Sequence, residues 1–143
     1  MDIIIGSDHA GYDMKEESRL FLENLPEYNV TDAGVHGRES SDYPNIAKKV
    51  AEAIANGEYA KGILICGSGI GMSIAANRYR GVRAALCHNL YLARMSRQHN
   101  DANILVMGGR VIGVGLALEM IEIFLKTEFE GGRHKKRLDL IDC

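Results

Sequence analysis

The sequence predicts an α/β protein of one domain, residues 1–143, in which a five-stranded parallel sheet lies between two layers of helices. Short runs rich in Ile, Val and Leu alternate with longer segments of helical periodicity, as expected when helices connect parallel strands. The apolar runs are nearly uninterrupted, as in strands that are buried on both faces of a sheet. A chain of 143 residues, 46% of them hydrophobic, has the size and the core of one ordinary domain.

Local patterns place the individual elements. Strands are predicted at 3–7, 28–34, 62–66, 82–87 and 103–108. Helices are predicted at 11–25, 41–57, 71–79, 90–99 and 114–129, and a short closing helix is expected within 130–142. Pro26 stops the first helix, whereas Pro44 suits the first turn of the second helix and Gly57 suits its end. The result is a three-layer α/β/α arrangement of the Rossmann-like kind.

Charge and composition narrow the function classes. The formal net charge is −2, so no overall field attracts nucleic acid or an anionic membrane. Three cysteines without a CxxC pair predict neither a disulfide framework nor a zinc site, and a reducing cytoplasm is the simpler expectation. The first residues, MDIIIGSDHAGY, do not resemble a signal peptide, and the chain has no apolar run of about 18 residues, so we expect no membrane partner.

Polar residues follow several of the predicted strands directly. Ligands of open parallel sheets bind at the carboxyl ends of the strands, so these residues are expected to share one edge. They are Ser7-Asp8-His9, Asp32-Ala33-Gly34, Cys66-Gly67-Ser68, Cys87-His88-Asn89 and Gly108-Gly109-Arg110.

The stretch GILICGSGIGMSIAANR, residues 62–78, places Gly67, Gly69 and Gly71 at alternate positions between a strand and a helix. Glycines at such a junction let backbone N–H groups approach an anion, but they also suit a tight turn that binds nothing. A dinucleotide fingerprint fits poorly, because Met72 stands where a further glycine is needed and the acidic residue expected about 20 positions later is missing. The Gly-Lys-Ser/Thr of a phosphate-binding loop is also missing.

Cys66, Asp8-His9 and His99 can each be interpreted as functional groups or as structural ones. Cys66 lies where amides and a helix dipole would favour a thiolate, yet an intracellular cysteine is more often a small buried residue, and Cys87 is assigned that role. Asp8-His9 would contact a sugar or a phosphate, or Asp8 would cap the next helix. His99 would act as an acid–base group, or would interact with the dipole at the end of its helix. The histidine spacings predict no metal site.

The tail segment GGRHKKR carries four formal positive charges in a chain that is otherwise acidic. Arg133 and Arg137 are four residues apart and would share one face of a helix, where two guanidinium groups suit a phosphate. The alternative is a solvated basic tail. Arg110, at the end of a strand, is a further candidate for binding an anion.

Taken together, these motifs closely resemble the type B ribose-5-phosphate isomerases and the related galactose-6-phosphate isomerase subunits. The matching segments are GSDHAGY (6–12), SDYP (41–44), ICGSGIGMSIAANR (65–78), SRQHNDANIL (96–105) and EGGRHKKR (130–137), which span nearly the whole chain. The resemblance implies a metal-free aldose–ketose isomerisation through a cis-enediolate, without a cofactor, in the pentose phosphate pathway. It also implies the strand order 2-1-3-5-4 and a homodimer, or a dimer of dimers, whose active sites are shared between subunits.

The resemblance further implies catalytic roles for individual residues. Cys66 would be the base that moves a proton between C1 and C2, since Met72 stands where other members carry a glutamate. Ser68 stands where many members have threonine and would keep the hydroxyl. His99 would open the sugar ring, with Asp8 near the furanose hydroxyls.

The remaining implied roles concern binding. The amides from Gly67 through Gly69 to Gly71, with Asn100, would stabilise the enediolate. Tyr43 would form a wall of the sugar pocket. The phosphate clamp would consist of His9, Arg110, Arg133 and Arg137.

Three other functions are weighed against ribose 5-phosphate isomerisation. A six-carbon substrate, allose 6-phosphate or galactose 6-phosphate, is the main rival within the same class. A non-catalytic phosphosugar-binding domain would keep the arginines but would need neither Cys66 nor His99. A flavodoxin-like or dinucleotide-binding domain is disfavoured by Met72.

Overall fold

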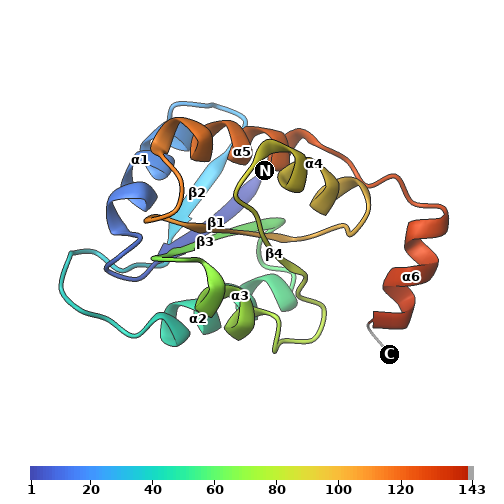
Figure 1. The fold of residues 1–143 in the computed structure, drawn as a ribbon, viewed down its shortest axis with the longest axis horizontal. Coiled ribbons are helices and arrows are strands. Elements are labelled where there is room, and N and C mark those ends of the chain that lie inside the picture. Colours follow the sequence, from blue (N-terminus) through green and yellow to red (C-terminus); the bar gives the residue numbers. More distant parts are fainter. Residues whose placement is uncertain (142–143) are drawn as a thin grey trace.

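A computed structural model of the chain describes residues 1–141, so Cys143, expected to have no role, lies outside the described residues. Strands and helices alternate as predicted, and a short last helix follows (Figure 1). The strands are β1 (Asp2–Ser7), β2 (Asn29–Asp32), β3 (Lys61–Cys66), β4 (Ala84–Leu86) and β5 (Ile104–Gly108). The helices are α1 (Tyr12–Glu23), α2 (Tyr43–Ala55), α3 (Ile70–Ala76), α4 (Leu90–Gln98), α5 (Val114–Lys126) and α6 (Arg133–Ile141).

The five strands form one parallel sheet in the order β2-β1-β3-β5-β4, which confirms the predicted fold class and strand order. In the central part of the sheet, Ser7 pairs with Ile65 and Cys66 pairs with Gly108. The ends of β1, β3 and β5 therefore meet at one carboxyl edge.

Alternate residues of the strands enter two separate cores. Ile3, Ile5 and Ile63 pack with α1, α4 and α5 on one face, whereas Ile4 and Leu64 pack with α2 and α3 on the other. Figure 1 shows these helices above and below the sheet. Burial on both faces explains why the strands read as continuous apolar runs.

Several predicted elements are longer than the observed ones, such as the helix predicted at 71–79, which ends at Ala76. Tertiary contacts explain two of these differences. The strand expected from residue 82 begins at Ala84, because the amide of Arg83 is taken by the side-chain oxygen of Asn103. The helix expected to reach residue 129 ends at Lys126, and Thr127 is extended. The carbonyl of Thr127 accepts a hydrogen bond from the side chain of Arg97.

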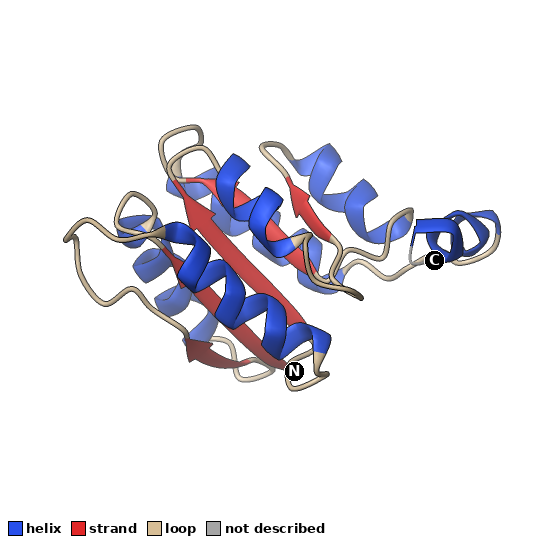
Figure 2. Cartoon of the chain, turned by 90° about the horizontal axis from the view of Figure 1, so that it is seen from below, coloured by secondary structure: helices blue, strands red, loops and turns tan. Residues whose placement is uncertain are grey.

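The last helix, α6, stands away from the sheet and its two layers at the far end of an extended segment (Figure 2). Its buried residues are His134 and Leu138, which are one turn apart and face the body of the molecule. Arg133, Arg137, Leu140 and Ile141 are exposed. Within residues 1–141, no helix combines the length and the apolar character that crossing a membrane requires.

Candidate active site

A cavity of about 610 Å³ opens at the carboxyl edge of the sheet. Loops that follow β1, β3 and β5 surround it, together with the beginnings of α2 and α3. Its lining residues are Asp8, His9, Ala10, Tyr43, Cys66, Gly67, Ser68, Ile70, Gly71, Ile74, Arg110 and Val111. The structure thus brings eight of the predicted site residues together.

Cys66 is the last residue of β3, and only 4% of it is exposed. The backbone N–H of Gly69 donates a hydrogen bond to its Sγ at 3.2 Å. Gly69 has a φ of 81°, and a Cβ there would lie 2.5 Å from Cδ1 of Leu86, so the turn requires glycine. This bond directs a backbone donor at the sulfur inside the cavity.

Ser68 lies beside Cys66 in the same turn. Its Oγ accepts a hydrogen bond from the N–H of Ile70 at 3.2 Å. This contact uses a lone pair of the oxygen and leaves the hydroxyl proton for a ligand in the cavity.

Asp8 lies in the turn before α1 but does not cap that helix, whose N-cap is Gly11 without a side-chain cap bond. It is 6% exposed and lines the cavity, while its Oδ1 accepts a hydrogen bond from the N–H of Gly11 at 3.0 Å. That bond holds the turn leading into α1. The carboxylate is therefore fixed in place with oxygen lone pairs left for a sugar hydroxyl.

His9 is held by Ser41 through two reciprocal hydrogen bonds. The backbone N–H of His9 donates to Oγ of Ser41 at 3.0 Å, and the backbone N–H of Ser41 donates to Nδ1 of His9 at 3.2 Å. Since Nδ1 is an acceptor, the neutral ring carries its proton on Nε2. The sequence did not indicate this function of Ser41, which is 32 residues from His9.

Tyr43 and Arg110 line the cavity next to the glycine turn. The ring of Tyr43 lies so close to Gly71 that a Cβ there would be 2.5 Å from its Cζ. The backbone N–H of Arg110 donates to the carbonyl of Gly67 at 3.0 Å. A Cβ on Gly67 would lie 3.5 Å from Nη1 of Arg110, so the guanidinium lies beside the turn.

Five predicted residues do not line this cavity. Gly69 lies within the turn and contacts the Cys66 sulfur, whereas His99, Asn100, Arg133 and Arg137 lie elsewhere. The helix α4 starts after the carboxyl end of β4 and returns to the amino edge before β5, so it carries His99 and Asn100 away from Cys66. A second cavity, of about 640 Å³, lies there beneath α6 and is lined by Asn100, Leu138 and residues 77–85, among others.

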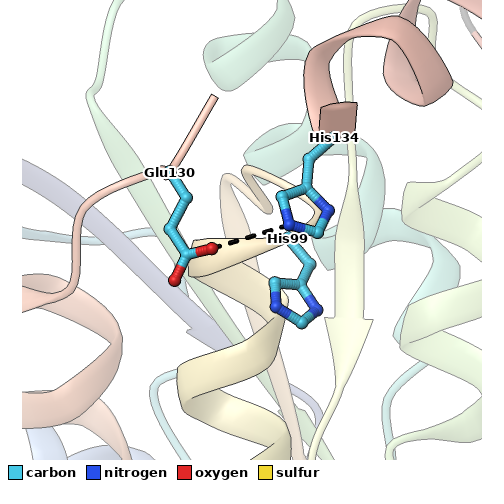
Figure 3. Close-up of side chains that lie close together, drawn as sticks. All are labelled: His99, Glu130 and His134. Atoms are coloured by element: carbon cyan, nitrogen blue, oxygen red, sulfur yellow. Dashed lines mark ion pairs between the residues drawn. The ribbon is translucent and has the colours of Figure 1, made fainter. Parts of the chain in front are cut away.

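His99 stacks on His134, a residue that the sequence analysis did not select. Their ring centroids are 4.2 Å apart with an interplanar angle of 12°, and Glu130 Oε2 lies 3.5 Å from Nε2 of His134 (Figure 3). Desolvation, followed by repulsion from His99 and Arg133, lowers the pKa of His134. The only signal in the sequence was its position between Arg133 and Arg137.

The donor atoms of His99, Glu130 and His134 lie within 4.8 Å of one another, a cluster that spacing along the chain does not predict. These are residue types that bind metals. Arg133 lies next to His134 and repels a cation.

Comparison with known proteins identifies the fold as that of one family. The model of the Ribose/Galactose Isomerase family matches residues 3–141. The chain belongs to this family. Ribose-5-phosphate isomerase B of Escherichia coli is 45% identical over 139 residues, which cover 97% of this chain and 93% of that protein.

Solved structures of family members agree with the fold. Ribose-5-Phosphate Isomerase B of Clostridium thermocellum superposes with a TM-score of 0.97 at 56% identity, covering 99% of this chain and 95% of that one. Ribose-5-phosphate Isomerase B from Mycoplasma genitalium, solved with bound ribulose-5-phosphate, has a TM-score of 0.91 at 39% identity and covers 99% and 93% of the two chains. In this fold, the residues that line the Cys66 cavity and the residues around His99 lie at opposite edges of one sheet.

Proposed function

We propose that the protein is a metal-independent aldose–ketose isomerase that interconverts ribose 5-phosphate and ribulose 5-phosphate. The observation that carries this proposal is the position of the Cys66 sulfur. It accepts a hydrogen bond from the N–H of Gly69 and lines one cavity with Asp8, His9 and Arg110. A sulfur base beside backbone donors is what proton abstraction next to a carbonyl requires. Similarity to ribose-5-phosphate isomerases over nearly the whole chain supports the substrate.

The chemical step follows from the position of the thiolate. Cys66 takes the proton from C2 of the open-chain aldose, and the C–H electron pair forms a C1–C2 double bond while the carbonyl pair moves onto O1. The O2 hydroxyl proton then passes to O1, the thiol returns its proton to C1, and O2 becomes the new carbonyl. Amides in the turn from Gly67 to Gly71 stabilise the enediolate between these steps, and one such donor contributes about 3 kcal/mol.

Ring opening needs a separate acid–base group, and we assign it to His99. A furanose opens when a proton leaves its anomeric hydroxyl and another reaches the ring oxygen. Ribulose 5-phosphate has too few free hydroxyls to close such a ring, so it bypasses this step. Asp8 lies in the cavity where it would bind the hydroxyls of the sugar.

A second copy of the chain would complete the site. His99 and Cys66 lie at opposite edges of one sheet, so a single subunit does not bring them to one substrate. Ile70, Ile74 and Val111 line the Cys66 cavity although each is more than half exposed, and Ile141 of α6 is 64% exposed. We infer a homodimer, or a dimer of dimers, in which α6 of one subunit covers the cavity of the other.

The phosphate would then be held from both subunits. The Nε2–H of His9 and the guanidinium of Arg110 lie on the cavity side. Arg133 and Arg137 lie on one face of α6, as a phosphate clamp requires. His134, on the same helix, adds a neutral ring that donates one hydrogen bond.

A cytoplasmic location accords with this chemistry. The thiol of Cys66 has to stay reduced to act as a base, and Cys66 and Cys87 are both free. The reaction would place the protein in the pentose phosphate pathway.

The decisive experiment compares Cys66→Ala with Cys87→Ala, which removes a buried thiol outside the cavity. Two rates are measured: isomerisation of ribose 5-phosphate, and exchange of the C1 hydrogen of ribulose 5-phosphate with deuterated water. Cys66→Ala should lower both rates by about 10²–10⁴, the usual contribution of a general base, and Cys87→Ala should lower neither. Calorimetry should show that Cys66→Ala still binds ribulose 5-phosphate.

Other outcomes distinguish the alternatives. Near-normal exchange in Cys66→Ala would mean that another residue is the base. Tight binding without turnover by the wild type would indicate a phosphosugar-binding domain. A higher kcat/KM for allose 6-phosphate or galactose 6-phosphate than for ribose 5-phosphate would reassign the substrate to six-carbon sugars.

His99→Asn should behave differently from Cys66→Ala. It should slow turnover of ribose 5-phosphate by about 10²-fold or more while exchange at C1 of ribulose 5-phosphate continues, because exchange needs the thiolate but not the ring-opening step. Equal losses in both assays would remove His99 from the role of ring opener.

A further inference from the structure

Arg97 is a buried arginine in the last turn of α4, two residues before His99. Its side chain is 7% exposed. The guanidinium donates to Oδ1 of Asp101 at 2.8 Å, to the carbonyl of Ala102 at 2.6 Å and to the carbonyl of Thr127 at 3.2 Å. A guanidinium buried with several partners fixes the segments that supply them, because its donors form a rigid planar fork.

One of these segments is the turn that carries His99 and Asn100. Asp101 in this turn has a φ of 44°, a backbone conformation that residues other than glycine rarely adopt. Its carboxylate accepts from Arg97 on one oxygen, and the other oxygen lies 3.4 Å from Nη2 of Arg83. The Nε of Arg83 also donates to the carbonyl of Asn100 at 3.0 Å. Two arginines therefore hold the turn.

The other segment is the strap, residues 127–132, which leads from α5 to α6. Arg97 holds its first residue through the Thr127 carbonyl, and the N–H of Glu130 donates to the carbonyl of Gln98 at 3.0 Å. The guanidinium also lies 5.7 Å from the ring centroid of Phe124, in α5 just before the strap. The strap is thus bound to the end of α4 at two points.

The stacked pair in Figure 3 depends on this connection. His99 comes from the turn and His134 from the helix that follows the strap, so the two rings meet only when both segments are held in register. Arg97 is the side chain that bonds to both segments.

We propose that Arg97 is a positioning residue, which aligns the acid–base group His99 with the phosphate-binding helix α6. The role assigned to His99 rests on the proposed function, whereas the alignment of the two rings does not. A guanidinium at position 97 sets the distance between the ring-opening group and the groups that hold the phosphate. It does so without touching substrate.

The test compares Arg97→Lys with Arg94→Lys, a matched change of an exposed arginine one turn earlier in α4. Lysine keeps the charge but cannot reach both segments at once. Arg97→Lys should lower kcat for ribose 5-phosphate by about 10–100-fold, since a misplacement of about 1 Å costs up to 10² in rate. C1 exchange of ribulose 5-phosphate at saturation should fall far less, so the ratio of exchange to turnover should rise about tenfold. Arg94→Lys should leave both rates unchanged.

A spectroscopic readout tests the alignment without activity. Stacked imidazoles shift each other's carbon-bound ring protons upfield, so the His99 and His134 signals should move toward ordinary values in Arg97→Lys. Signals that stay at the wild-type positions, with an unchanged ratio of exchange to turnover, would overturn the proposal. A wild type without isomerase activity would refute the proposed function, and the ring signals would still decide the role of Arg97.

Asp101→Asn is a second variant, which changes the volume of the side chain very little and so disturbs folding less. Asparagine tolerates the left-handed backbone, and it removes the charge that Arg97 and Arg83 share. We expect the same change in ring signals and in the ratio, at smaller amplitude. If Arg97→Lys does not fold and Asp101→Asn matches the wild type in both readouts, the proposal is wrong.

Discussion

Replacing Gly71 with alanine tests whether the ring of Tyr43 forms a wall of the substrate cavity. A Cβ at this position would lie 2.5 Å from Cζ, 2.7 Å from Cε2 and 3.0 Å from Cε1 of Tyr43. Ordinary contacts begin at 3.4 Å, so the ring has to move by about 1 Å. The ring is free to move, because 39% of Tyr43 is exposed.

The expected result is a large effect on kinetics and a small one on stability. A wall displaced by about 1 Å should lower kcat/KM for ribose 5-phosphate by about 10–100-fold. Gly71 is the second residue of α3, and alanine gains about 0.5–1 kcal/mol over glycine in a helix. That gain offsets most of the cost of moving an exposed ring, so the free energy of unfolding should change by less than about 1 kcal/mol. Steady-state kinetics and urea denaturation measure the two quantities.

Two controls separate displacement of the Tyr43 ring from the general effect of replacing glycine with alanine in a helix. Gly115 is the second residue of α5, and a Cβ there would meet nothing within 4 Å. Gly115→Ala should therefore stabilise the protein without changing kcat/KM. In a Tyr43→Ala background, Gly71→Ala should have no further kinetic effect, because the ring that it displaces is gone. A full loss of kcat/KM in that background, or a wild-type value for Gly71→Ala alone, would refute the reasoning.

Three further predictions concern other parts of the molecule. Burial raises the pKa of Cys87 to about 11, so between pH 9 and 11 its thiol ionises in the unfolded chain but much less in the folded one. The free energy of unfolding, measured by urea titration, should therefore fall over this range by about 2 kcal/mol more in the wild type than in Cys87→Ala. Equal falls in the two proteins would contradict the burial argument. Arg137→Ala should raise KM for ribose 5-phosphate by about 10–100-fold through the loss of a charge-assisted hydrogen bond, whereas Lys136→Ala should not, and equal KM values would make the tail a solvated surface. Turnover should persist in excess EDTA because backbone amides stabilise the enediolate, and activity that disappears with EDTA and returns with a divalent ion would show a metal requirement.

The sequence by itself determined the elements and the edge of the sheet at which the chemistry gathers. Periodicity is a local property, so it located each strand and helix to within a few residues. Parallel strands all end at one edge, and this rule brought Asp8, Cys66 and Arg110 together before any contact was known. The matching motifs added the strand order, which local patterns do not contain.

The tertiary structure alone decided which side chains hold the functional groups. Ser41 reaches His9 across 32 residues, and Arg97 reaches Thr127 across 30. His99 meets His134, and Tyr43 covers Gly71, through the packing of helices that are distant in the chain. The path of α4 places His99 and Cys66 at opposite edges of the sheet, as the length of the predicted helix before His99 had indicated. Such contacts depend on the relative placement of whole elements, which arises from the packing of both cores at once and leaves no repeating pattern in the sequence.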